Sequence, residues 1–196
     1  MDGFQLILAL CMGISLSAAC GFRVFVPLLA LSLGVRFLGV PVSEHLAWVG
    51  SDTALVCLSV ATVVEVLAYY IPFVDNALDA VAGPLAIAAG AVITAGLLPE
   101  MPEVIRWGMG IIAGAGAAGT VQLGTTAARG ASSAGTAGLG NFVVATAENV
   151  ASVCGSVVAV VVSPILALVL LVALVWLIWR LLRKLRRRSA SAASVG

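Results

Sequence analysis

Two ionisable side chains inside long apolar runs constrain this chain more than any other feature. Arg23 lies in the apolar run of residues 4–33, and Glu65 lies in that of residues 53–71. An ionised side chain at the centre of a membrane helix costs roughly 2.5 to 3.5 kcal/mol on insertion scales. We therefore expect both side chains to turn inward in a helical bundle, toward each other or toward a substrate.

Composition supports a membrane class. Of the 196 residues, 62% are hydrophobic and 10% are charged, whereas soluble domains have about 25% charged residues. The sequence predicts an all-α, polytopic membrane protein with one transmembrane domain over residues 1–179. Residues 180–196 form a basic tail that we expect to be cytoplasmic and partly disordered. Asp2 stands where a signal peptide would be basic, so we expect the first apolar run to be retained.

About six transmembrane helices are expected, because a span needs about 20 apolar residues. The first run is too long for one straight crossing, and we expect it to be broken at Gly21 or kinked at Pro27. If the chain from residue 142 onward is partly re-entrant, the number of crossings is five. The apolar stretches are residues 4–33, 53–71, 83–98, 104–118 (extending toward Ala128), 142–163 and 164–179.

The connecting segments carry weaker signals. Residues 40–51 read as an interfacial loop or a short surface helix. Ser51 or Asp52 is a predicted N-cap, and Asn141 is another. Residues 72–79 read as a membrane-edge turn. Residues 130–140 (GASSAGTAGLG) read as a solvated loop or as backbone lining a cavity.

The Gly-rich fourth span has small-xxx-small spacing at Gly110/Gly114 and Ala115/Gly119. Such faces let helix backbones approach closely. Packing within the bundle is favoured over a gate or pore lining. The same faces would also allow a homo-oligomer.

Three groups of polar residues are candidates for a site. Arg23 and Glu65 could form a buried ion pair, hold an anion, or accept a proton or cation. Asp75, Asn76 and Asp79 could bind a cation if they are helical, or cap a turn.

The third group is Arg129, Asn141 and Glu148. Here an Arg is followed by a Glu in the next span, as in the first half of the chain, which suggests a 3+3 inverted repeat of the kind found in transporters.

Signals for an enzyme are poor. His45 is the only histidine, and neither a Gly-x-Ser-x-Gly elbow nor a Walker loop is present. The four cysteines are scattered through apolar segments and read as small core residues. We expect no catalysis, metal, cofactor or nucleic-acid partner.

Several motifs resemble a bacterial integral-membrane family described as domain of unknown function 4126. They are Gly21–Pro27, Trp48–Ser51, Glu65 followed by Ile71–Asn76, Arg129 after an Ala-rich run, and Ala147–Glu148. The resemblance extends to about Pro164. It implies a small helical inner-membrane protein and brings no established activity.

The chain departs from that family pattern at several polar positions. The family often has Asp-Lys at Tyr69–Tyr70, His and Lys at Gln122 and Thr125, and Asp at Asn149. Because of these departures, this chain has fewer titratable side chains that could form a proton relay. The shared polar residues are then Arg23, Glu65, Asp75, Asn76, Arg129 and Glu148.

The leading hypothesis is a small transporter or flippase-like protein in the bacterial inner membrane. Arg23 and Arg129 would bind an anionic group or lipid phosphate. Glu65 and Glu148 would balance the charge of these arginines or gate them. The alternative is a non-catalytic scaffold or subunit whose buried charges fix the fold. The basic tail would favour anionic lipid.

Overall fold

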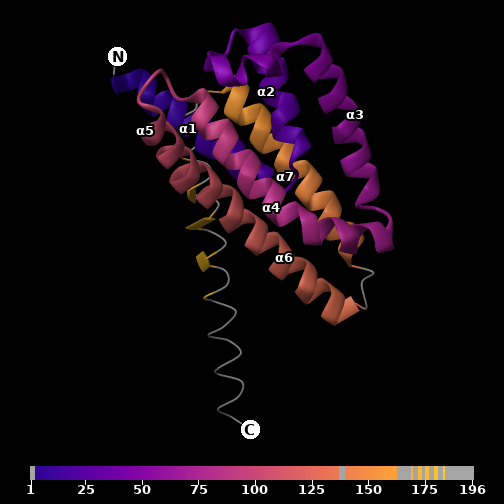
Figure 1. Ribbon diagram of the computed structural model, residues 1–196. Coiled ribbons are helices and arrows are strands. Elements are labelled where there is room, and N and C mark those ends of the chain that lie inside the picture. The colour runs from indigo at the N-terminus through magenta and orange to yellow at the C-terminus, as the bar shows by residue number, and fades with distance from the viewer. Residues whose placement is uncertain are drawn as a thin grey trace.

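The chain folds into a bundle of helices in a computed structural model (Figure 1). The structure describes residues 3–136 and 140–162, and beyond them residues 169, 172, 173, 175, 176, 179, 180 and 183. It describes no side chains at residues 72, 73, 75–77, 79 and 80. In these parts all regular elements are helical. Their order is α1 (Gly3–Cys20), α2 (Phe25–Leu38), η1 (Glu44–Gly50), α3 (Asp52–Ala68), α4 (Pro72–Leu97), α5 (Glu103–Met109), η2 (Gly110–Ala115), α6 (Gly116–Thr136) and α7 (Asn141–Val161).

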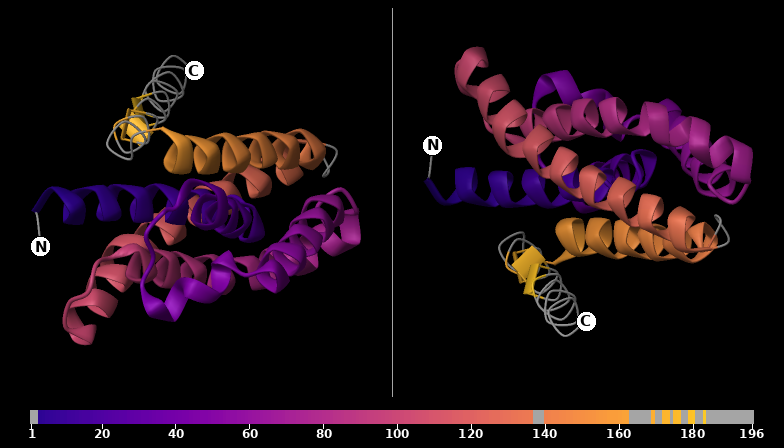
Figure 2. Two further views of the ribbon diagram at one scale, coloured as in Figure 1. Left: turned by 90° about the horizontal axis from the view of Figure 1, so that it is seen from above. Right: turned by 90° about the horizontal axis from the view of Figure 1, so that it is seen from below.

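Helix α1 is the central element of the bundle. Figure 2 shows it running between α4 on one side and α7 on the other, with α6 crossing both. Its last two turns are almost fully buried. Ser17 on this helix donates to the Gly90 carbonyl oxygen of α4 at 2.8 Å and lies 2.9 Å from Thr94 Oγ1. Small side chains therefore bring α1 and α4 into close contact.

Three helices in the described part are long and apolar enough to cross a membrane. They are Gly3–Cys20, the continuous Glu103–Thr136 and Asn141–Val161. The pair η1 and α3, bent by 70°, would be a fourth. These helices agree with the predicted membrane class. The predicted crossing at 164–179 and the tail at 180–196 lie largely outside the described residues.

The first apolar run is broken where the sequence predicted. Helix α1 ends at Cys20 and α2 begins at Phe25, while Pro27 falls in the first turn of α2, where its missing N–H costs nothing. Ser51 caps α3 as expected, since its Oγ accepts from the Ala54 N–H at 3.1 Å. Residues 44–50 form a short 3₁₀ helix.

Three local predictions are wrong. Residues 72–79 are helical and open α4, because Pro72 at its first turn has the backbone angle that a helix start requires. Residues 130–136 are helical and continue α6, where Thr136 Oγ1 donates to the Ser132 carbonyl at 2.7 Å. Asn141 does not cap α7; its amide donates instead to Ser133 Oγ of α6 at 3.1 Å.

The glycines of the fourth span pack inside the bundle. A Cβ on Gly110 would lie 2.7 Å from the Ala91 carbonyl oxygen, and one on Gly114 would collide with Gly90 and Thr94. Their face is therefore covered by α4 of the same chain. The helix is π-helical over η2, the six residues that include both glycines.

We expect Gly110→Ala to destabilise the protein relative to Gly116→Ala. Ala is favoured over Gly in a helix by about 1 kcal/mol. At Gly110 the new methyl group overpacks the contact with α4, which costs about 1 to 3 kcal/mol, while Gly116 has open space around it. Apparent melting temperatures of the two purified variants in one detergent test this. Equal temperatures would show that the α4 contact is not tight.

Candidate functional site

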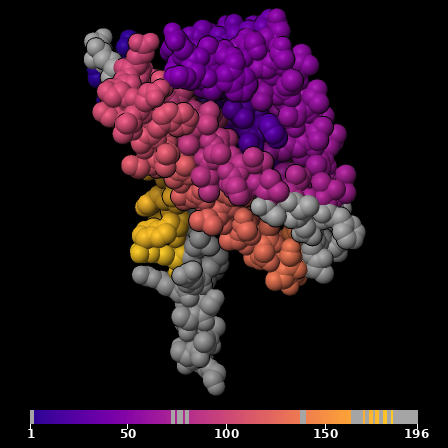
Figure 3. All heavy atoms as spheres, viewed as in Figure 1, coloured from indigo at the N-terminus to yellow at the C-terminus, as the bar shows by residue number. Residues whose placement is uncertain are grey.

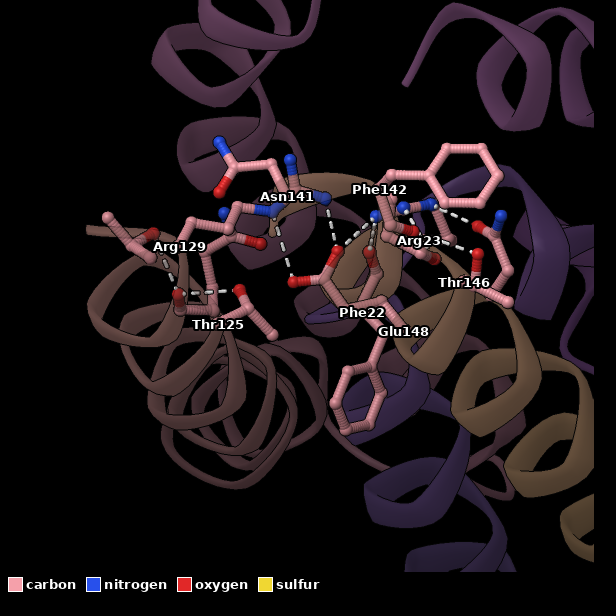
Figure 4. A network of polar contacts seen from close by, with 12 residues as sticks. Phe22, Arg23, Thr125, Arg129, Asn141, Phe142, Thr146 and Glu148 are labelled. Carbon is pink, nitrogen blue, oxygen red and sulfur yellow. Dashed lines mark hydrogen bonds and ion pairs between the residues drawn. The ribbon is translucent and has the colours of Figure 1, made fainter. Parts of the chain in front are cut away.

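Arg23, Arg129 and Glu148 form a buried ionic cluster at the break between α1 and α2 (Figure 4). Arg23 Nη1 donates to Glu148 Oε2 at 2.9 Å. Arg129 Nε donates to Oε1 of the same carboxylate at 3.1 Å, and its Nη2 also contacts Oε2. At most 5% of each side chain is exposed. Two guanidinium groups thus share one carboxylate.

Arg23 makes three further hydrogen bonds. Its Nε donates to Asn149 Oδ1 at 2.6 Å, Nη1 to the Phe22 carbonyl at 2.7 Å and Nη2 to the Ala145 carbonyl at 3.3 Å. Arg23 therefore joins the end of α1 to one face of α7. A buried charge is stable only when it is paired and hydrogen-bonded in this way.

Glu65 makes no ion pair with Arg23, so the direct pair, one of the alternatives that the sequence left open, is not formed. Its carboxylate accepts the backbone N–H groups of Val24 at 2.8 Å and Phe25 at 2.9 Å. These are unsatisfied donors at the start of α2, where the helix dipole favours a negative charge. Glu65 thus acts as a cap, supplied by α3, for a helix whose own first residues have no capping side chain.

The carbonyl groups at the end of α1 are satisfied from two sides. The Ala19 oxygen accepts hydrogen bonds from the N–H groups of Phe22 and Arg23. It also accepts one from Ser152 Oγ of α7 at 3.2 Å. Gly21 is needed here because a Cβ would lie 2.6 Å from the Ala118 carbonyl oxygen of α6. The break is therefore held by α3, α6 and α7 together.

Tyr69 connects the two arginines. The ring centroid lies 3.7 Å from Arg23 Cζ and 4.5 Å from Arg129 Cζ, within the range of cation–π contacts. Only 6% of Tyr69 is exposed, so the ring is buried within the bundle. The adjacent Tyr70 hydroxyl accepts from Asn149 Nδ2 at 3.1 Å.

The cluster includes residues that the sequence analysis did not select. Tyr69 stands one helical turn after Glu65, and Ser152 stands one turn after Glu148, so both could have been found from helical spacing. Asn149 directly follows Glu148, and this spacing gives no such signal. All three belong to the polar interior around the cluster.

Four predicted site residues remain to be placed. The side chains of Asp75, Asn76 and Asp79 lie outside the described residues. Asn141 contacts Ser133 near the end of α6. Among the described residues, no group of three or more His, Cys, Asp or Glu side chains is placed to hold a metal ion.

A large apolar groove lies beside the cluster, between α3 and α4. Its volume is about 510 Å³. Figure 3 shows the surface hollowed here, with indigo atoms of the N-terminal part visible between the purple and magenta helices. Glu65 and Tyr69 form the polar part of the wall. The apolar part includes Val60, Val64, Ala68, Leu78, Val81 and Leu85.

These features define a helical membrane protein with a buried Arg–Glu–Arg cluster at a broken helix. The family described as "Domain of unknown function (DUF4126)" matches residues 10–184, and the chain belongs to this family. The resemblance seen in the sequence motifs is thereby confirmed. No curated protein and no solved structure is significantly similar to the chain.

We expect Glu65→Gln to destabilise the protein by about 1 to 3 kcal/mol, the cost of an unsatisfied buried donor. An amide replaces one of the two acceptor oxygens with an NH2 donor, which would face a backbone N–H group at the start of α2. Thermal unfolding of the purified protein in detergent measures the loss.

The matched control is Glu44→Gln, since Glu44 is exposed. We expect it to unfold like the original protein. Equal stability of the Glu65 variant and the control would show that capping by the carboxylate is dispensable.

Proposed function

We propose that the protein is a small transporter or flippase-like protein for an anionic lipid, with its site at Arg23, Arg129 and Glu148. The observation that carries this is the position of Tyr69. Its ring contacts both guanidinium groups and also forms part of the wall of the apolar groove. An acyl chain and an anionic head group would thus find adjoining surfaces of matching chemistry.

The groove suits a hydrocarbon chain. Its exposed lining is almost wholly apolar, and it lies between two helices that bury little of their facing surfaces against each other. Val60, Val64 and Val81 are each more than half exposed. Such residues would face lipid or an acyl chain in a membrane. Burial of each methylene group from water is worth about 0.8 kcal/mol.

The charges suit an anion. Two arginines share one carboxylate, and the start of α2 adds the positive end of a helix dipole, which Glu65 offsets. Guanidinium groups bind phosphate with paired hydrogen bonds. A phosphate would compete with Glu148 for the arginines. Displacement of Glu148 would then couple binding to a shift of α7.

The finer topology is part of the proposal. We infer six spans arranged as a 3+3 inverted repeat in a bacterial inner membrane, with the C-terminus cytoplasmic. In support, an interrupted helix and a Glu on the following span occur in both halves: the break at Gly21 with Glu65, and the π-helical η2 with Glu148. The proposed role involves no catalysis. A homo-oligomer would use faces other than the covered Gly110 and Gly114.

A structural scaffold is the second candidate. It is favoured by the four hydrogen bonds of Arg23, all of which are made to groups of the protein itself. In that case the buried charges would fix the packing of α1, α2, α6 and α7. Removing one partner of such a cluster costs about 3 to 5 kcal/mol.

We expect Arg129→Gln to slow lipid movement by about tenfold or more, the effect of losing one charged hydrogen bond. The protein is reconstituted in vesicles with fluorescent phosphatidylglycerol, and bleaching of outer-leaflet label reports exchange between leaflets. Arg36→Gln is the control, because Arg36 pairs with Asp52 at the surface. Lipid movement that is equal in Arg129→Gln and the original protein, at equal folding, would contradict the transport role.

A second comparison tests the groove. We expect Ala61→Phe to slow exchange, because Ala61 lines the groove, while Val63→Phe on the same helix should leave exchange unchanged because Val63 does not line it. Equal rates in both variants would exclude the groove as the path. An original protein without activity, whose Arg129 variant only loses stability, would favour the scaffold.

A further inference from the structure

We propose that a second site, at the opposite end of α4 from the groove, binds a phosphate group. It is a small pocket of about 90 Å³ bounded by the segment before η1, the last turns of α4, and α5. Its polar lining consists of Ser43, His45, Arg106 and Trp107. None of these residues belongs to the Arg23 cluster, so this inference does not depend on the proposed function.

Arg106 is buried but poorly satisfied. Only 8% of its side chain is exposed. Among the described residues its guanidinium group has one ionic partner, Glu103 Oε1, at the long distance of 3.5 Å. A guanidinium group has five N–H donors, and buried polar groups are normally hydrogen-bonded. Arg106 therefore has several donors left for a ligand, in contrast to Arg23.

Ser43 provides a second donor without a partner. Its Oγ is buried and makes no hydrogen bond within the described part of the chain. Its backbone N–H is fixed by a 2.7 Å hydrogen bond to the Gly96 carbonyl at the end of α4. The unpaired hydroxyl group thus belongs to a residue that lines the same pocket as the incompletely paired arginine. Both groups can donate to an oxyanion.

The charges around the pocket allow an anion to enter. Glu103 is 72% exposed and lies 3.5 Å from both Arg106 Nη2 and His45 Nε2, and His45 is 65% exposed. Glu103 can therefore turn into solvent when an anion replaces it. This makes Glu103 a competitor of the ligand, and removing its charge should tighten binding.

A phosphate group suits this site, because a guanidinium group binds phosphate with paired hydrogen bonds. The contact with Glu103 is long, so it leaves donors of Arg106 available. Trp107, 40% exposed, and Trp48 of η1, 54% exposed, are of the type that gathers at the level of lipid head groups. The phosphate could belong to a lipid or be free in solution.

Trp107 lines the pocket, so its fluorescence can report binding. The full-length protein in a non-ionic detergent is titrated with inorganic phosphate and, separately, with short-chain phosphatidylglycerol. We expect at least one of them to give a saturable change that is lost in Trp107→Phe. Saturation by phosphatidylglycerol alone identifies a lipid head group, and saturation by inorganic phosphate identifies a free-phosphate site.

Three variants decide whether the pocket is responsible. Arg106→Gln should raise the Kd by about tenfold or more, and Ser43→Ala should raise it several-fold. Glu103→Gln should lower it. If Arg106→Gln does not fold, the proposal still requires a higher Kd in Ser43→Ala and a lower Kd in Glu103→Gln. No saturable change with either titrant, or equal Kd values in all variants, would overturn the proposal.

Discussion

The fold depends on how the backbone is satisfied at the break between α1 and α2. Four N–H groups and four carbonyl groups are left unpaired at each such junction, and an apolar surrounding cannot satisfy them. Here α3 supplies the Glu65 carboxylate to the start of α2, and α7 supplies the Ser152 hydroxyl to the end of α1. The break therefore fixes the positions of two helices that are distant in sequence.

The buried cluster follows from that junction. Once α1 ends at Cys20, the side chain of Arg23 is directed toward α7, where Glu148 and Asn149 receive it. Arg129 reaches the same carboxylate from α6, and Tyr69 closes the group from α3. Small residues make this possible, because α4 and η2 approach so closely at Gly90 and Gly110 that no side chain would fit.

Much of the fold could be predicted from the sequence, because long apolar runs and the break at Gly21 are local signals. The partner of Arg23 could not, since Glu65 and Glu148 are equally plausible until α3 and α7 are placed. Residues 130–136 were misjudged because low helix propensity was outweighed by continuation of a long helix. Arg106 was not selected, because it lies at the end of an apolar run, where an arginine at the membrane interface is ordinary.

The length of the helix from Glu103 to Thr136 can be compared with the thickness of a membrane. Arg106 and Arg129 are 23 residues apart on it, which at about 1.5 Å per residue corresponds to about 35 Å. The hydrocarbon core of a bilayer is about 30 Å thick. If this helix crosses the membrane, the two buried arginines stand near opposite leaflets.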